Sequence, residues 1–195
     1  MSFVCIIPAR GGSKRIKNKN IKFMAGKPLI AWTIEAAKKA KVIDDIYVTS
    51  ENKKILKISK KLNIKTINRP RALSNDKIHV DDAVLHCYRT IKKRYDYIVL
   101  LQPTSPLRNH KHISEAIKLI KRTKADCLVS VVKKKILLWT KKNKFIEPVS
   151  YKIFKRPRSQ DMKLFSENGA IYITKAKIFL QNKNRLGGKI IAYEM

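Results

Sequence analysis

The chain has 195 residues, 44% of them apolar, which is enough for one domain with its own core and excludes a disordered protein as the first expectation. Its formal net charge of +31, from 45 Lys and Arg against 14 Asp and Glu, would attract any polyanion. However, 34 of the 45 cations are lysines, and they recur on the polar faces of nearly every expected helix. Arginine, which contacts guanine and phosphate through two hydrogen bonds, is sparse. We therefore expect no specific nucleic-acid partner.

Strand-like and helix-like segments alternate along the chain. Apolar runs predict strands at Phe3–Pro8, Asp45–Thr49, Ile64–Ile67, Tyr97–Leu101, Cys127–Val132, Ala170–Thr174 and Lys189–Tyr193. Apolar residues at helical spacing predict helices that begin at Pro28, after an N-cap at Ser50, and over 80–91, 113–120 and 175–180. The alternation predicts an α/β fold of Rossmann-like type, with a doubly wound, mostly parallel sheet covered by helices.

The alternation stops after Val132. Residues 133–165 carry lysine clusters around Leu137–Trp139 and Phe145, and we expect a small inserted arm, built on a hairpin, within a single domain of residues 1–195. Its apolar residues indicate contact with a partner subunit, which would make a homodimer; the alternative is that they pack on the chain's own sheet.

Cysteine usage and the N-terminal segment bear on location. Cys5, Cys87 and Cys127 lie far apart in apolar segments, which predicts buried, reduced thiols. The apolar run Phe3–Ile7 is too short for a signal peptide, and no run approaches membrane-spanning length. We expect a cytoplasmic protein with no membrane association.

Ligands of such sheets bind outside the carboxyl ends of the strands. Three expected loops lie there, at 9–20, 68–76 and 102–108, and a fourth, at 166–169, leads into a strand and so approaches from the neighbouring edge. Two prolines stiffen the third loop, which suits it to hold a ligand, although a rigid turn without a ligand is the alternative.

The first loop carries the clearest chemistry. A Gly-Gly pair and Ser13 lie among five cations: Arg10, Lys14, Arg15, Lys17 and Lys19. Glycines allow consecutive N–H groups to turn toward one anion, and the cations supply charge, which together favour a nucleoside triphosphate. The pattern is neither Gly-x-x-x-x-Gly-Lys-Ser/Thr nor Gly-x-Gly-x-x-Gly, and a merely basic solvated loop is the alternative.

Five segments in register resemble the acylneuraminate cytidylyltransferase family, the CMP-sialic acid synthetases and their bacterial relatives. They are IIPARGGSKRI…KN (6–20), GKPLI (26–30), RPRALSND (69–76), LLQPTSPLR (100–108) and ENGAIYI (167–173), and they extend over nearly the whole chain. The related KDO cytidylyltransferases usually carry Gly-Asp in place of Pro103-Thr104, which favours the sialic-acid-type branch.

The resemblance implies a reaction and a set of residues. CTP and a nine-carbon 2-keto sugar acid, of sialic, legionaminic or pseudaminic type, would give the CMP-sugar and pyrophosphate. The residues that match the nucleotide-binding pattern are Arg10, Gly11, Gly12, Ser13, Lys14, Lys19, Asn20 and Arg69, with Lys19 and Arg10 as the catalytic candidates. The residues that match the sugar-binding pattern are Gln102, Ser105, Arg156, Arg158, Gln160 and Asn168.

The chain also departs from the family pattern. Lys17 stands where the family commonly has Pro, and the spacing from Gln160 to Asn168 is one residue short, without the usual Pro. The chain closes at Glu194-Met195, just before the family's Asp-x-Asp, whose carboxylates normally hold the Mg²⁺ expected as cofactor. The carboxylates that remain, Asp76, Asp81, Asp82 and Asp161, are not placed by the sequence as substitutes.

Two alternatives to an active enzyme follow from these observations. A non-catalytic or decayed CTP-binding homologue would keep the loops and lack the metal-binding carboxylates. A polyanion-binding protein would rest on the net charge alone, and its binding to random DNA would depend on salt and resist competition by CTP.

Overall fold

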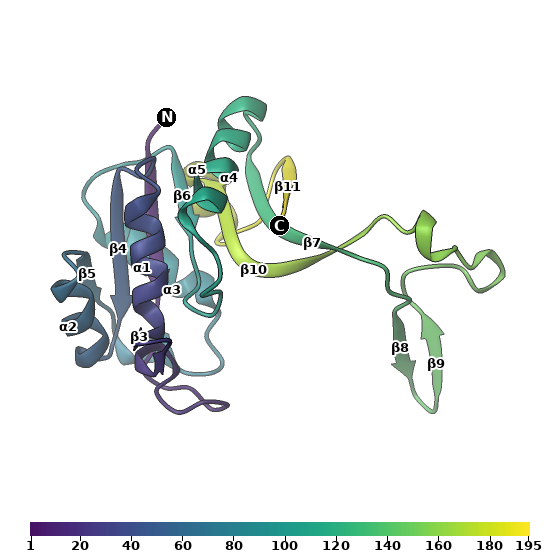
Figure 1. Cartoon of the computed structure of the whole chain (residues 1–195), viewed down its shortest axis with the longest axis horizontal. Helices are drawn as coiled ribbons and strands as arrows, with labels where there is room; N and C mark the ends of the chain where they lie inside the picture. Colours follow the sequence, from purple (N-terminus) through teal and green to yellow (C-terminus); the bar gives the residue numbers. More distant parts are fainter.

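A computed structural model describes all 195 residues and places a seven-stranded sheet at the centre of the molecule (Figure 1). The strand order is β11-β7-β10-β6-β1-β4-β5. Only β10 runs antiparallel to its neighbours. The strands are β1 (Phe3–Pro8), β4 (Asp45–Ser50), β5 (Lys65–Asn68), β6 (Tyr97–Leu100), β7 (Cys127–Lys134), β10 (Leu164–Lys175) and β11 (Ile190–Glu194). The predicted mostly parallel α/β sheet is confirmed.

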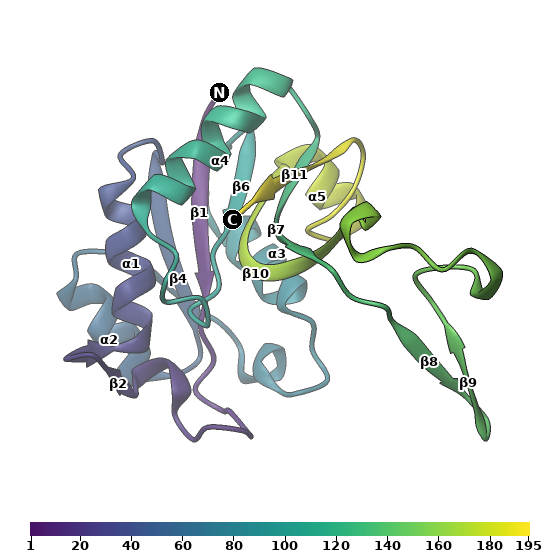
Figure 2. The ribbon, with the colours of Figure 1, turned by 45° about the vertical axis from the view of Figure 1, so that its right-hand side comes forward.

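Helices cover both faces of the sheet (Figures 1 and 2). One face carries α1 (Leu29–Lys39), α2 (Lys53–Lys61) and α4 (His110–Thr123), and the other carries α3 (Val80–Thr90) and α5 (Ala176–Asn182). In β1, alternate side chains enter the two cores, Phe3, Cys5 and Ile7 on one side and Val4 and Ile6 on the other. Burial on both faces explains why β1 reads as a continuous apolar run.

Two local predictions are corrected. Ser50 does not cap α2; the Asn52 side chain accepts hydrogen bonds from the N–H groups of Lys54 (2.9 Å) and Ile55 (3.3 Å), while Ser50 Oγ accepts from the Asn52 N–H. Strand β10 begins at Leu164, six residues before the expected start. Its early part, residues 164–167, is mostly exposed and pairs with the outer end of β7, and an irregularity separates the two paired stretches between Glu167 and Tyr172.

The segment after β7 forms an arm that stands away from the sheet (Figure 1). In it, β8 (Trp139–Lys142) and β9 (Phe145–Pro148) pair antiparallel, and two short 3-10 turns follow at Ile153–Lys155 and Ser159–Asp161. Most of the arm's large apolar side chains remain exposed, Phe154 at 99%, so they do not pack on the chain's own sheet; Met162, at 6%, is buried.

Shorter elements and the thiols complete the chain. A two-stranded ribbon, β2 (Phe23–Met24) with β3 (Lys27–Pro28), precedes α1, and 3-10 turns lie at Lys19–Ile21 and Arg71–Ser74. All three cysteines are free and buried, as predicted. None of the helices combines the length and apolar character needed to cross a bilayer.

Candidate active site

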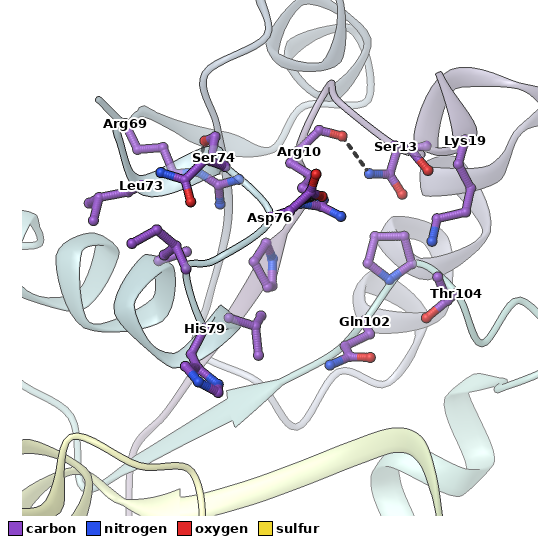
Figure 3. Close-up of a pocket in the computed structure, with 17 residues that line it drawn as sticks. Arg10, Ser13, Lys19, Arg69, Leu73, Ser74, Asp76, His79, Gln102 and Thr104 are labelled. Carbon is purple, nitrogen blue, oxygen red and sulfur yellow. Dashed lines mark hydrogen bonds and ion pairs between the residues drawn. The ribbon is translucent and has the colours of Figure 1, made fainter. Parts of the chain in front are cut away.

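A cavity of about 240 Å³ opens beyond the carboxyl ends of β1 and β6 (Figure 3). Residues from three loops that are distant in sequence line it. They are Arg10, Ser13, Lys19 and Asn20 from the first loop, Arg69, Ser74 and Asp76 from the second, and Gln102, Pro103 and Thr104 from the third. Six residues that the sequence indicated as binding residues therefore meet in one place: Arg10, Ser13, Lys19, Asn20, Arg69 and Gln102.

The glycine pair of the first loop does not behave as a simple anion nest. The Gly11 N–H donates to a carboxylate oxygen of Glu51 (2.6 Å), so it is engaged by an anion of the protein itself and is not free for a phosphate, contrary to expectation. A Cβ at Gly11 would lie 2.4 Å from Asn52 Nδ2, which explains the glycine by close packing instead. Gly12 has open space around it and, with Lys14, lines a shallow extension of the site.

Asn20 holds the shape of the first loop. Its side chain is buried, and Nδ2 donates to the Arg10 carbonyl oxygen (2.8 Å), the dashed contact in Figure 3. The adjacent Lys19 lies on the same side of the cavity as Thr104 and Gln102 (Figure 3). Asn20 thus contributes to the site by fixing a backbone turn, whereas Lys19 presents a charge.

One carboxylate joins the two other cations of the first loop. Asp76 Oδ1 lies 2.7 Å from an Arg10 guanidinium nitrogen, and Asp76 Oδ2 lies 3.0 Å from Lys14 Nζ. The hydrogen bonds from Lys14 and Arg10 hold the pKa of Asp76 below its ordinary value, so the carboxylate is charged at neutral pH. Lys19 forms no such ion pair. A phosphate that uses Arg10 and Lys14 must replace Asp76.

We expect Asp76→Asn to tighten the binding of metal-free CTP. The substitution removes the internal anion that competes for Arg10 and Lys14, and two exposed ion pairs of this kind correspond to a decrease of about threefold to tenfold in the dissociation constant. Calorimetry without Mg²⁺ measures it, with Asp161→Asn on the arm as the control. Weaker binding by the Asp76 variant would show that this carboxylate assists the nucleotide.

Arg69 lines the cavity but is mostly turned toward the protein. Its side chain is 3% exposed, and it donates from Nε to Ser74 Oγ (2.8 Å) and from a terminal nitrogen to Glu51 (3.3 Å). A second terminal nitrogen donates to the Thr49 carbonyl (3.5 Å). Burial lowers the pKa of Arg69, and the Glu51 charge opposes that effect. Arg69 therefore braces the second loop as well as forming part of the cavity wall.

The residues expected on the sugar side are only partly brought together. Gln102 lines the cavity, and a Cβ built at Gly169 (φ +70°) would lie 3.5 Å from Gln102 Oε1, so the stretch 166–169, which is part of β10 and not the expected fourth loop, lies against it. Asn168, however, accepts from Ser130 Oγ (2.6 Å) and the Ala170 N–H (3.0 Å) and does not line the cavity. Ser105 does not line it either; its neighbours Pro103 and Thr104 do.

The three expected sugar-binding residues of the arm lie outside the cavity of their own chain. Arg156, Arg158 and Gln160 are exposed beside the two 3-10 turns, on the arm that extends away from the sheet (Figure 1). Within one chain, the structure does not unite them with Gln102.

Sequence reasoning missed Arg108, the last residue of the LLQPTSPLR segment. Its guanidinium is buried and donates to the carbonyl oxygens of Gln102 (3.1 Å) and Ala170 (2.8 Å) and to Thr33 Oγ1 (2.7 Å). No carboxylate pairs with it, Nε has no partner, and burial lowers its pKa to about 10. Arg108 therefore ties the third loop to β10 and α1. The segment contained the residue, but no local pattern shows that it turns inward.

Comparison with known proteins agrees with this geometry. Residues 4–192 match a family model described as Cytidylyltransferase. N-acylneuraminate cytidylyltransferase A of Danio rerio is 35% identical over 97% of this chain and 45% of its own length, and the N-acylneuraminate cytidylyltransferase of Escherichia coli O18:K1:H7 is 32% identical over 98% and 46%. The chain thus spans about half the length of the curated relatives it matches.

Solved structures confirm the fold. A CMP:2-keto-3-deoxy-manno-octonic acid synthetase complexed with CTP superposes with a TM-score of 0.75 at 16% identity, over 100% of this chain and 90% of the other. A 4-diphosphocytidyl-2C-methyl-D-erythritol synthase from Anaerococcus prevotii gives 0.73 at 11% identity, over 99% and 88%. With the family pattern extending over 189 positions, from residue 4 to residue 192, and its loops converging on one cavity, this chain belongs to the cytidylyltransferase family.

Proposed function

We propose that this chain transfers CMP from CTP to a nine-carbon 2-keto sugar acid, of sialic, legionaminic or pseudaminic type, and releases pyrophosphate. The observation that carries the proposal is that Arg10, Ser13, Lys19 and Gln102 line one cavity at the ends of β1 and β6. Relatives named N-acylneuraminate cytidylyltransferase, at 32–35% identity, support this choice of reaction.

The proposed chemistry is attack by the sugar's anomeric hydroxyl on the α-phosphorus of CTP. A new phosphorus–oxygen bond forms as the hydroxyl proton passes to water, the bond between the α-phosphorus and the bridging oxygen breaks, and pyrophosphate leaves with increased negative charge. Nucleotidyl transfer depends largely on positioning and on stabilising charge at the phosphates. Arg10 and Lys14 would hold the triphosphate, and Lys19 would offset the charge on the departing pyrophosphate.

Magnesium belongs to the proposal as the cofactor, but residues 1–195 do not form a site for it. Asp76 is the only carboxylate that lines the cavity, and both its oxygens are paired with cations. Nowhere does the chain bring together three His, Cys, Asp or Glu side chains that could ligate a metal. No step above passes through a protein-bound ion. Pyrophosphate release measured in EDTA and over a Mg²⁺ titration tests the requirement.

The reaction is tested by two measurements on the same protein. Calorimetry with CTP, and with ATP and UTP as controls, measures nucleotide binding, and pyrophosphate release with a panel of nonulosonic acids measures turnover. Release that depends on CTP and on one of these acids supports the enzyme. CTP binding without release with any acid would instead support a non-catalytic homologue, since the cations of the first loop attract a triphosphate without catalysis.

We expect Gln102→Ala to impair use of the sugar acid more than binding of CTP. Gln102 lies beside Gly169 on the side of the cavity away from Arg69, and losing one hydrogen bond to a substrate corresponds to roughly a tenfold change in the KM of the sugar. Gln181→Ala, at an exposed position of α5, is the control. A variant that loses CTP affinity while sugar saturation stays unchanged would contradict this role.

The arm supports a homodimer as part of the proposal. Its exposed apolar side chains include Trp139, Phe145 and Phe154, and a hydrophobic surface of this kind marks an interaction site. We expect the wild type to sediment as a dimer and Phe154→Asp to shift it toward monomer, with Lys144→Ala in the β8–β9 turn as the control. An unchanged dimer in the Phe154 variant would place the interface elsewhere.

We also assign the protein to the cytoplasm, on the basis of its thiols. Cys5, Cys87 and Cys127 are all unpaired, and disulfides are the rule for cysteines in oxidising compartments. Fractionation of cells that express the protein, probed by immunoblot, tests the assignment.

A further inference from the structure

Glu51 lies between two loops of the site without lining the cavity itself. It follows β4, and its carboxylate contacts both the first loop (residues 9–20) and the second loop (residues 68–76). One oxygen accepts the Gly11 N–H (2.6 Å), and the other accepts the Ser74 hydroxyl (2.7 Å) and a terminal nitrogen of Arg69 (3.3 Å). No motif of the sequence includes this residue.

These contacts form a closed network. Ser74 Oγ also accepts a hydrogen bond from Arg69 Nε (2.8 Å), so the three side chains hold one another as well as the first loop. An ionised carboxylate is an acceptor only and can satisfy all three donors at once, whereas any neutral substitute leaves at least one contact weaker.

The network is well enclosed. The Glu51 side chain is 13% exposed and that of Arg69 is 3% exposed. Burial acts to raise the pKa of Glu51, but the hydrogen bonds from Ser74 and the Gly11 N–H, together with the charge of Arg69, outweigh burial and bring the pKa below its ordinary value. Glu51 is therefore ionised at neutral pH, and a buried charge pair of this kind is costly to break from one side.

Glu51 differs from Asp76, the other carboxylate that joins the same two loops. Asp76 lines the cavity and pairs with the cations that a phosphate would use. Glu51 lines a second groove, beside Gly11 and Ser74. A triphosphate would compete with Asp76 for Arg10 and Lys14, whereas Glu51 contacts neither of these cations.

We propose that Glu51 is a positioning residue that fixes the spacing between the first and second loops and thereby prepares the cavity for a nucleoside triphosphate. It acts through Gly11, which lies next to Arg10, and through Ser74 and Arg69, which line the cavity. The nucleotide in this statement rests on the proposed function; the coupling of the two loops does not.

Amide hydrogen exchange without nucleotide tests the coupling directly. We expect Glu51→Ala to speed exchange in both loops by about tenfold or more, since it leaves the Gly11 N–H and the Arg69 guanidinium without their partner, while exchange in β1 and β6 stays unchanged. Glu51→Gln, which keeps an acceptor for Gly11 but loses the charge, should lie between wild type and Glu51→Ala. The matched control is Glu35→Ala, which removes a partly buried glutamate of α1 that is paired with Lys27.

The binding of CTP by the same four proteins completes the test. We expect the dissociation constant to rise by about tenfold in Glu51→Ala, less in Glu51→Gln, and not in Glu35→Ala. If Glu51→Ala also speeds amide exchange throughout the sheet, the substitution has loosened the whole fold. Exchange in the two loops and CTP binding are then compared between Glu51→Gln and the wild type instead. Wild-type exchange rates in both loops of the Glu51 variants would overturn the proposal. A wild type that binds no CTP would overturn the proposed function, while hydrogen exchange would still decide the role of Glu51.

Discussion

Lys19→Ala is expected to slow nucleotidyl transfer by roughly 10²–10³-fold, the usual cost of losing one charge-stabilising contact in a transition state. Lys19 lines the cavity beside Gln102 and Thr104, and unlike Arg10 and Lys14 it forms no ion pair that must first be broken. Because the charge of Lys19 acts on the leaving pyrophosphate, we expect the substitution to lower kcat much more than CTP affinity.

Steady-state pyrophosphate release and calorimetry with CTP separate these two effects. The matched control is Lys22→Ala, which removes an exposed lysine three residues further along the chain, just after the first loop, that does not line the cavity. Equal losses at the two positions would mean that the loop contributes only general positive charge. A loss of CTP affinity with unchanged kcat would mean that Lys19 stabilises bound CTP and not the transition state.

Arg108→Met is expected to lower the free energy of unfolding by about 2–4 kcal/mol. Methionine fills a similar volume, but it leaves the carbonyl oxygens of Gln102 and Ala170 and the hydroxyl of Thr33 without their buried donor. Each unsatisfied buried group costs about 1–3 kcal/mol, and the relief from no longer burying an unpaired guanidinium offsets part of the sum.

Urea denaturation measures the Arg108 effect, with Arg122→Met, on the exposed side of α4, as the control. In the folded variant, the third loop should lose its attachment to β10, so the KM of the sugar should rise more than that of CTP. A stability equal to wild type would show that the desolvation of the guanidinium cancels the value of its three hydrogen bonds.

The sequence correctly predicted those elements that depend only on residues close together in the chain. The apolar run Phe3–Pro8 has the bounds of β1, because a central strand buried on both faces needs apolar residues at every position. Helix α1 begins directly after Pro28, as expected from the fixed φ of proline. The early start of β10 was missed because the mostly exposed stretch 164–167, Leu-Phe-Ser-Glu, has only two apolar residues and becomes a strand only by pairing with β7, some thirty residues away.

In the candidate site, too, some features could be predicted from the sequence and others depend on the tertiary structure. The sequence by itself determined the family, the chemistry of the first loop and six of the residues that line the cavity, because these reside in residue types at fixed spacing. Only the tertiary structure decided that Gly11 turns toward Glu51, that Asp76 pairs with both Arg10 and Lys14, and that Arg108 is buried. It also separated Arg156 and its neighbours from the cavity of their own chain. The physical reason is that the direction of a side chain, its burial and its partners depend on contacts between segments far apart in the chain, which no local pattern encodes.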